Sequence, residues 1–251
     1  MPAPELIRIS HIKNELTRNW ILLLAASTGV ICSSIVLPFY SLGALVVPIT
    51  EEFGWSRAEF QLALLFSTGT GVITAPLVGI VIDKVGARVV ALSGLVGLSC
   101  ALILAAFQNG ELWMLYFAYT AMAFLGAGTI PVTWTRAITS IFVTQRGLAL
   151  GIMLSGTGIC AITVPQLTVW LTSEYGWRTA YLGLAALPTL LAGPLVYFFF
   201  KPATSVEEGS EAAIASEQGM TFSEAIRGYR FWVLLTSIFL VYIAMSGMVP
   251  N

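Results

Sequence analysis

Long apolar runs dominate this amino-acid sequence. A helix needs about 20 residues to cross the hydrocarbon layer of a membrane. In hydrocarbon the backbone must satisfy its own hydrogen bonds, and runs of this length do so as helices rather than as the short alternating strands of a barrel. The sequence therefore predicts an all-α membrane protein, a six-helix transmembrane bundle with a seventh helix at the short limit. The runs lie near residues 20–49, 60–82, 89–107, 112–142, 148–171, 180–200 and 231–249.

The composition supports a lipid environment and excludes several functions. Charged residues make up only 10% of the chain and the mean hydropathy is +0.86, whereas an ordinary soluble domain carries about a quarter charged residues. The lipid bilayer is thus a predicted partner. The net charge of −1 gives no basic field for nucleic acid. His11 is the only histidine, and the sequence has no metal-binding cluster and no phosphate-cradling loop. We expect no enzyme activity, no metal and no cofactor.

Basic residues set the predicted topology, because loops rich in Lys and Arg stay on the cytoplasmic side. The outer loops hold only Arg57 and Arg178. We therefore predict a multi-pass protein of the plasma (inner) membrane, with a cytoplasmic leader at 1–19 and the six-helix domain at 20–200. The segments predicted to be inside hold Arg8, Lys13, Arg18, Lys84, Arg88, Arg146, Lys201, Arg227 and Arg230.

A polar segment at 201–230 separates the sixth run from the seventh. It predicts a cytoplasmic central loop, after which residues 231–251 begin a second domain. Thr221 and Glu224 have the spacing of a helix capping box. The loop is thus expected to end in a short helix along the membrane surface. The apolar face of that helix would consist of Phe222, Ile226, Tyr229 and Val233.

The second and fifth runs resemble each other. "STGTGVITAP" at 67–76 and "SGTGICAITVP" at 155–165 align once two residues are allowed as an insertion. These spans cross in opposite directions, so the similarity predicts a three-plus-three inverted repeat, which is known from secondary transporters. Chance similarity between helices rich in Gly and Thr is the alternative. In the repeat, Pro76 and Pro165 would interrupt equivalent helices.

Small residues recur at every fourth position of the same two spans, which lets helix backbones approach closely. They pack either within the six-helix unit or against helices outside this sequence. They are Ser67, Gly71, Ala75 and Gly79 in the second span, and Gly147, Gly151 and Ser155 in the fifth.

The stretch "GIVIDKVGAR" at 79–88 gathers charges between two apolar runs. It resembles the cytoplasmic loop signature of the major facilitator superfamily, although Lys84 replaces the more usual arginine. The resemblance implies the first half of a twelve-span transporter whose C-terminal half is missing here. It also implies a conformational latch, with the aspartate in a charge network. The alternative is a plain positive-inside anchor. The latch residues are Gly79, Asp83, Lys84, Gly86 and Arg88.

Two further motifs narrow the resemblance. "QRGLALGIMLSGTG" at 145–158 and "EEFGWSR" at 51–57 resemble the branch of monocarboxylate porters and oxalate/formate antiporters. The first span lacks the lysine of the animal monocarboxylate porters, and the fifth lacks the antiporter pattern of drug exporters. The resemblance implies alternating-access transport of a small organic solute, a carboxylate anion, with a coupled proton as an option and symport or antiport left open. The alternatives are a non-transporting half or an exporter of neutral or amphipathic compounds.

The sequence ends at "SGMVPN" in the seventh run, which fits a fragment, an interrupted frame or an assembly of two chains.

Arg136 is the one ionisable residue predicted to lie within a span. An arginine in hydrocarbon costs several kcal/mol, so it predicts a substrate-binding role. Alternatively, its long side chain reaches the headgroups. The resemblance places the first and fourth spans at the transport cavity, which suggests further substrate-binding residues. These are Tyr40, Ser41, Tyr119, Thr133 and Trp134.

Overall fold

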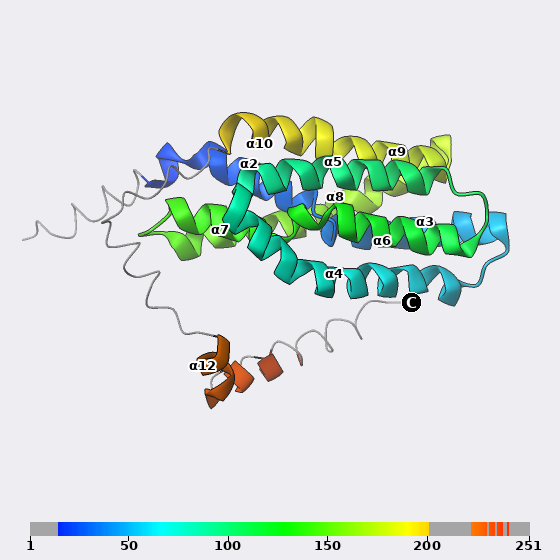
Figure 1. The fold of residues 1–251 in the computed structure, drawn as a ribbon. Helices are drawn as coiled ribbons and strands as arrows, with labels where there is room; N and C mark the ends of the chain where they lie inside the picture. Colours follow the sequence, from blue (N-terminus) through cyan, green and yellow to red (C-terminus); the bar gives the residue numbers. More distant parts are fainter. Residues whose placement is uncertain (1–14, 201–221, 230, 234, 238–239, 241–251) are drawn as a thin grey trace, which may run out of the picture. The chain divides into compact units, whose positions relative to one another are not determined.

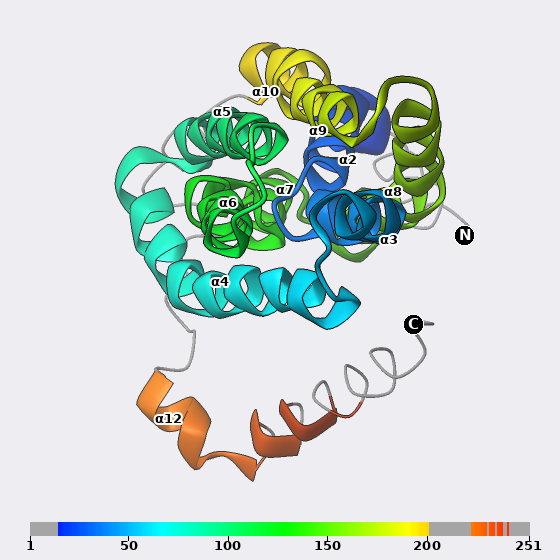
Figure 2. The ribbon, with the colours of Figure 1, turned by 90° about the vertical axis from the view of Figure 1, so that its right-hand side faces the viewer.

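The computed structural model describes residues 15–200, 222–229, 231–233, 235–237 and 240, and the secondary structure found in these ranges is helical. The chain divides into two units, Met1–Ala203 and Thr204–Asn251. The first unit contains the predicted bundle (Figures 1 and 2). Its elements are α2 (Trp20–Ile31), α3 (Val36–Phe53), α4 (Arg57–Val85), α5 (Ala87–Ala106), α6 (Leu112–Leu125), η1 (Ala127–Thr129), α7 (Pro131–Ile141), α8 (Arg146–Tyr175), α9 (Trp177–Ala186), the π-helical η2 (Leu187–Ala192) and α10 (Gly193–Phe199).

These helices confirm the predicted fold class. Five of the described helices are long and apolar enough to cross a membrane, and α2 and α6 are shorter apolar helices. The helices run roughly antiparallel in a bundle (Figure 1). One end, which we call the basic end, carries Lys84, Arg88 and Arg146 at the α4–α5 turn and at the start of α8.

The first and fourth predicted spans are each divided in two, which the sequence analysis did not predict. The first breaks between α2 and α3, and the fourth breaks around η1. The backbone N–H of Ser34 in the first break donates to Oγ1 of Thr129 in the second, at 2.9 Å. The indole of Trp134 donates to the carbonyl oxygen of Thr129 at 2.7 Å. Backbone groups released from a helix inside a membrane need such partners. The first bond joins the two breaks, and the second lies within the fourth span.

Pro76 and Pro165 do not interrupt their helices. Both lie inside continuous helices, α4 and α8, although Figure 1 shows α4 bending along its length. The expectation of broken second and fifth spans was wrong. The breaks occur instead in the first and fourth spans, which are again three spans apart, as a three-plus-three repeat requires.

Two glycines on α5 allow close packing against the fourth span. A Cβ added at Gly94 would lie 2.7 Å from the Cα of Gly128, and one at Gly97 would lie 2.4 Å from the carbonyl oxygen of Leu125. Both neighbours are backbone atoms of the broken fourth span. A side chain at either position would push the two spans apart, so these glycines set their spacing.

The second unit contains α12 (Phe222–Arg227), where a short helix was predicted. Thr221, the predicted cap, lies outside the described residues. Residues 231–233 and 235–237 are helical. Most of the seventh span lies outside the described residues, and it stays a prediction.

Candidate functional site

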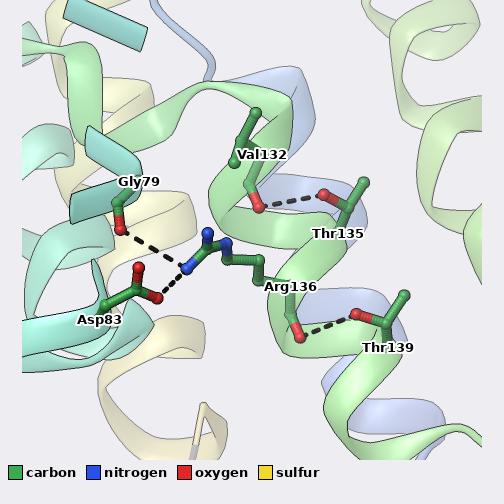
Figure 3. A network of polar contacts seen from close by, with 6 residues as sticks. All are labelled: Gly79, Asp83, Val132, Thr135, Arg136 and Thr139. Atoms are coloured by element: carbon green, nitrogen blue, oxygen red, sulfur yellow. Dashed lines mark hydrogen bonds and ion pairs between the residues drawn. The ribbon is translucent and has the colours of Figure 1, made fainter. Parts of the chain in front are cut away.

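An ion pair joins the second and fourth spans at the basic end (Figure 3). Nη1 of Arg136, on α7, bonds to the carboxylate of Asp83 in the last turn of α4. The same nitrogen lies 3.5 Å from the carbonyl oxygen of Gly79, one turn earlier. The side chains of Arg136 and Asp83 are 42% and 65% exposed on the bundle surface. Arg136 thus fastens α7 to the end of α4.

The local sequence explains this geometry. Gly79 and Asp83 are four residues apart, so they lie on one face of α4. A Cβ at Gly79 would lie 3.8 Å from the guanidinium of Arg136, so the helices come close there without a clash. The hydroxyls of Thr135 and Thr139 donate to carbonyl oxygens of their own helix. The contacts of the Arg136 guanidinium are with Gly79 and Asp83 of α4 (Figure 3).

The structure combines two sets of residues that the sequence analysis kept apart. Asp83 was assigned to the latch and Arg136 to substrate binding, yet they form one pair. Arg88, also assigned to the latch, donates instead to the backbone oxygen of Tyr197 on α10. Lys84 is exposed, and Gly86 forms the α4–α5 turn with φ of +84°. A positive φ favours glycine, so this residue fixes the turn.

The predicted wall residues lie mainly inside the bundle. The hydroxyl of Tyr119 is 3.3 Å from that of Tyr181, and Trp134 packs beside Gly29. Four of the five side chains are enclosed by neighbouring helices in this structure, and their substrate-binding role stays a prediction. Only Tyr40 is partly exposed, and its binding role stays a prediction. The four buried residues are Ser41, Tyr119, Thr133 and Trp134.

Helix α3 does present an open stripe, made of residues that the sequence analysis missed. Phe39, Val47 and Ile35, which directly precedes α3, are exposed, and a Cβ at Gly43 would meet no atom within 4 Å. Their four-residue spacing on a helix was the available signal. This stripe is the surface that α3 offers to a ligand, to lipid or to another helix.

Most of the small-residue positions on α4 and α8 also point into open space. A Cβ at Gly71, Gly147 or Gly151 would meet no atom within 4 Å, and Ser155 is exposed. Ser67 and Ala75 are partly buried, and Ala75 packs against an apolar cluster that contains Val78 and Ile82.

The end of the bundle opposite the basic end has its own polar contacts. Glu52, near the end of α3, accepts from the Trp177 indole at 2.6 Å and from Arg178 at 2.8 Å. The Arg178 guanidinium also lies 4.1 Å from the centre of the Trp177 ring. Trp177 is only 4% exposed, so its ring is buried among the helices. It joins the first span to the sixth.

Glu15, in the leader, binds the loop before α8. Its carboxylate accepts from the backbone N–H of Val143 at 2.9 Å, the hydroxyl of Thr144 at 2.7 Å and the N–H of Gln145 at 3.2 Å. Burial acts against the charge, but these hydrogen bonds outweigh it and lower the pKa of Glu15 below its ordinary 4.5. Glu15 therefore tethers the leader to the start of the fifth span.

This fold defines a multi-pass helical membrane protein. The chain belongs to the Major Facilitator Superfamily, whose model matches residues 19–251. It is a protein of a transporter family rather than an enzyme.

Individual relatives are similar over part of their length. The chain is 30% identical to human "Monocarboxylate transporter 14" over 62% of this chain and 31% of the relative. It is 28% identical to rat "Monocarboxylate transporter 13", over 61% and 38% respectively. It is 25% identical to "Multidrug resistance protein MdtG" of Proteus mirabilis, over 74% and 45%. The chain thus spans less than half the length of these curated relatives.

Proposed function

We propose that the chain forms one half of a secondary transporter that moves a small organic carboxylate across the plasma membrane by alternating access. In this proposal the N-terminus is cytoplasmic, and further sequence or a second chain supplies the other half. The observation that carries the proposal is the pair of Asp83 and Arg136, because it places the acidic residue of the loop signature in a charge contact between two spans. Membership of the superfamily and the names of the monocarboxylate relatives support it.

The ion pair suits a latch because it is weak. An ion pair with both partners partly exposed contributes about 1 kcal/mol or less. Such a contact biases a conformational equilibrium yet breaks and reforms within a transport cycle. The Gly86 turn directly after Asp83 keeps the carboxylate at the end of α4, next to Lys84. A second half that approached this end would change the surroundings of the pair.

Arg136 has a second proposed role in holding the substrate. The contacts to Asp83 and Gly79 both use Nη1. The other N–H groups of the fork can donate to a substrate carboxylate, for which a guanidinium has matching geometry. Tyr40 is the predicted wall residue that stays partly exposed and is the second proposed contact.

A charge swap separates these two roles. Uptake of labelled lactate, pyruvate and oxalate would be measured in vesicles containing the complete reading frame, at equal protein abundance. Asp83→Asn alone should slow uptake. If Arg136 serves only the latch, Asp83→Arg with Arg136→Asp restores the pair and the rate. If it also binds substrate, the swap raises KM even when the latch is restored. Arg57→Gln is the control, since it removes an exposed positive charge at the other end of α4. Unchanged uptake in Asp83→Asn would refute the latch.

Gly71 of α4 and Gly151 of α8 are proposed to pack against the missing half. Gly71 and Gly151 meet nothing within the described part of this chain, although small residues permit close helix contact. Replacing either by leucine should leave the folded bundle intact and abolish uptake by the complete protein. A loss of stability in the isolated chain would contradict this assignment.

A second candidate is the export of neutral or amphipathic compounds. The apolar stripe of Ile35, Phe39, Gly43 and Val47 favours it, as does the similarity to a protein named for multidrug resistance. Competition separates the two: a carboxylate transporter is inhibited by excess pyruvate, whereas an exporter of amphipathic compounds is inhibited by a hydrophobic cation. Proton coupling is proposed only as an option, and an imposed pH gradient tests it.

A further inference from the structure

The basic end contains a cavity of about 510 Å³. It lies between α2, the α4–α5 turn, α7 and α10, all within the first unit. Its volume falls in the range of ligand sites, which is roughly 300–1,000 Å³. Most of the lining is apolar and includes Leu22, Ile82, Val89, Leu92, Ile141 and Phe200. Arg88, Arg136 and Ser140 add polar groups.

The two arginines of this cavity differ in how their charges are balanced. The guanidinium of Arg136 faces the carboxylate of Asp83. Arg88 bonds to the backbone oxygen of Tyr197 and lies 5.2 Å from the centre of its ring. In the described part of the chain, no carboxylate forms an ion pair with Arg88. A neutral oxygen and a ring leave its positive charge uncompensated, so the cavity carries an excess positive charge that favours an anion.

The start of α5 adds hydrogen-bond donors to the same place. Residues 86–89 line the cavity. No side chain caps this helix start, and its first turn holds no acidic residue. In contrast, Ser56 and Glu59 cap the start of α4 in a capping box. The first N–H groups of a helix have no partner within the helix, and its dipole attracts negative charge. An oxygen-rich anion suits this position.

We propose that the cavity binds an anionic phospholipid. Its phosphate lies at Arg88 and the start of α5, and an acyl chain covers the apolar lining formed by Leu92, Ile141 and Phe200. The apolar lining favours a lipid over a small soluble anion, because a free phosphate would leave that lining uncovered. The bilayer supplies the ligand directly. The cavity shares Arg88 and Arg136 with the proposed latch, but lipid binding does not depend on transport and does not require a second half.

The test uses the purified 251-residue chain in a neutral detergent. Thermal unfolding is followed while phosphatidylglycerol, phosphatidylcholine with the same acyl chains, or inorganic phosphate is added. Phosphatidylglycerol is expected to raise the melting temperature, and the other two are not. Equal shifts with the two lipids would overturn the proposal. An equal shift with phosphate would show a simple anion site and would overturn the lipid assignment.

Two variants, with a third as the control, test whether the lipid binds in this cavity. Arg88→Gln should weaken the apparent affinity for phosphatidylglycerol about tenfold, which corresponds to one lost charge-assisted hydrogen bond. Lys84→Gln removes the same charge from the same turn but does not line the cavity, so it should bind like the parent chain. Leu92→Trp should also weaken binding, because it fills the apolar part and keeps Arg88. Equal affinities in Arg88→Gln and Lys84→Gln would overturn the proposal. If Arg88→Gln does not fold, the test rests on Leu92→Trp. Unchanged binding of phosphatidylglycerol by Leu92→Trp would then overturn the proposal.

Discussion

Gly94→Ala tests how closely the third span packs on the broken fourth span. The added Cβ would lie 2.7 Å from the Cα of Gly128, 2.8 Å from its carbonyl carbon and 2.9 Å from the nitrogen of Thr129. Ordinary contact begins near 3.4 Å, so α5 must move by roughly 0.7 Å at the van der Waals limit. All three neighbours are backbone atoms, which cannot rotate away as a side chain can.

The expected cost follows from that overlap. Overpacking of a tight core costs about 1–3 kcal/mol. For a chain of this size, each kcal/mol lowers the melting temperature by about 2–4 °C. Alanine also favours the helix by about 1 kcal/mol, so Gly94→Ala should melt up to about 8 °C lower than the parent chain in thermal unfolding of the purified protein in detergent.

Gly71→Ala is the matched control. Gly71 also lies inside a long helix, but a Cβ there meets nothing within 4 Å. Alanine is the better helix former by about 1 kcal/mol, so this variant should melt at the same temperature as the parent or higher. Equal melting temperatures for the two variants would refute the close packing of α5 against Gly128.

Four further predictions concern polar contacts. Glu52→Ala should destabilise the chain by about 1–3 kcal/mol, since it leaves the buried Trp177 indole without an acceptor; thermal unfolding measures this. Glu15→Gln should cost about 1 kcal/mol near neutral pH, as loss of a helix cap does. The lowered pKa of Glu15 means that its contribution is present above pH 4.5 and lost as the pH falls through the lowered value. The melting temperatures of parent and Glu15→Gln should therefore converge in acid. Asp83→Asn should change the melting temperature little, because exposed pairs contribute about 1 kcal/mol or less, while slowing uptake by the complete protein. Arg136→Lys should raise KM for a carboxylate at normal abundance, because an ammonium lacks the planar fork.

Each of these predictions has a result that contradicts it. Unchanged stability in Glu52→Ala would mean that water replaces the lost acceptor. If the difference in melting temperature between the parent chain and Glu15→Gln did not change with pH, the charge of the carboxylate would not be the cause of the stabilisation. A large stability loss in Asp83→Asn would make the pair structural rather than a latch. An unchanged KM in Arg136→Lys would mean that only the positive charge of Arg136 matters and that the geometry of its guanidinium does not.

Hydropathy predicted the fold class well because the membrane imposes one dominant constraint. Apolar runs of 20 residues or more have few other solutions. Hydropathy cannot locate the breaks, because residues 32–35 and 126–130 stay apolar or small while the backbone leaves the helix. What stabilises those breaks is the contact of Ser34 with Thr129, and a partner 95 residues away leaves no local signal.

The candidate site was predicted in parts but not as a unit. Gly79 and Asp83 were found from a local motif, and Arg136 was found because a charge within a span is unusual. Their pairing depends on how α7 packs on α4, which one sequence does not reveal. Tyr119 and Trp134 were assigned to a wall by span alone, whereas their helical faces turn into the bundle. A residue's position on the face of its helix decides whether it is exposed, and the choice of span alone does not determine that face.

Uptake by proteoliposomes tests whether this chain can transport a carboxylate without a second half. Two samples are compared at equal protein abundance, one with the 251-residue chain and one with the complete reading frame that contains it. Labelled lactate, pyruvate and oxalate serve as substrates. We expect saturable uptake by a complete protein that has a second six-helix half, and none by the chain alone. Saturable carboxylate uptake by the chain alone, with crosslinking that shows a monomer, would contradict it.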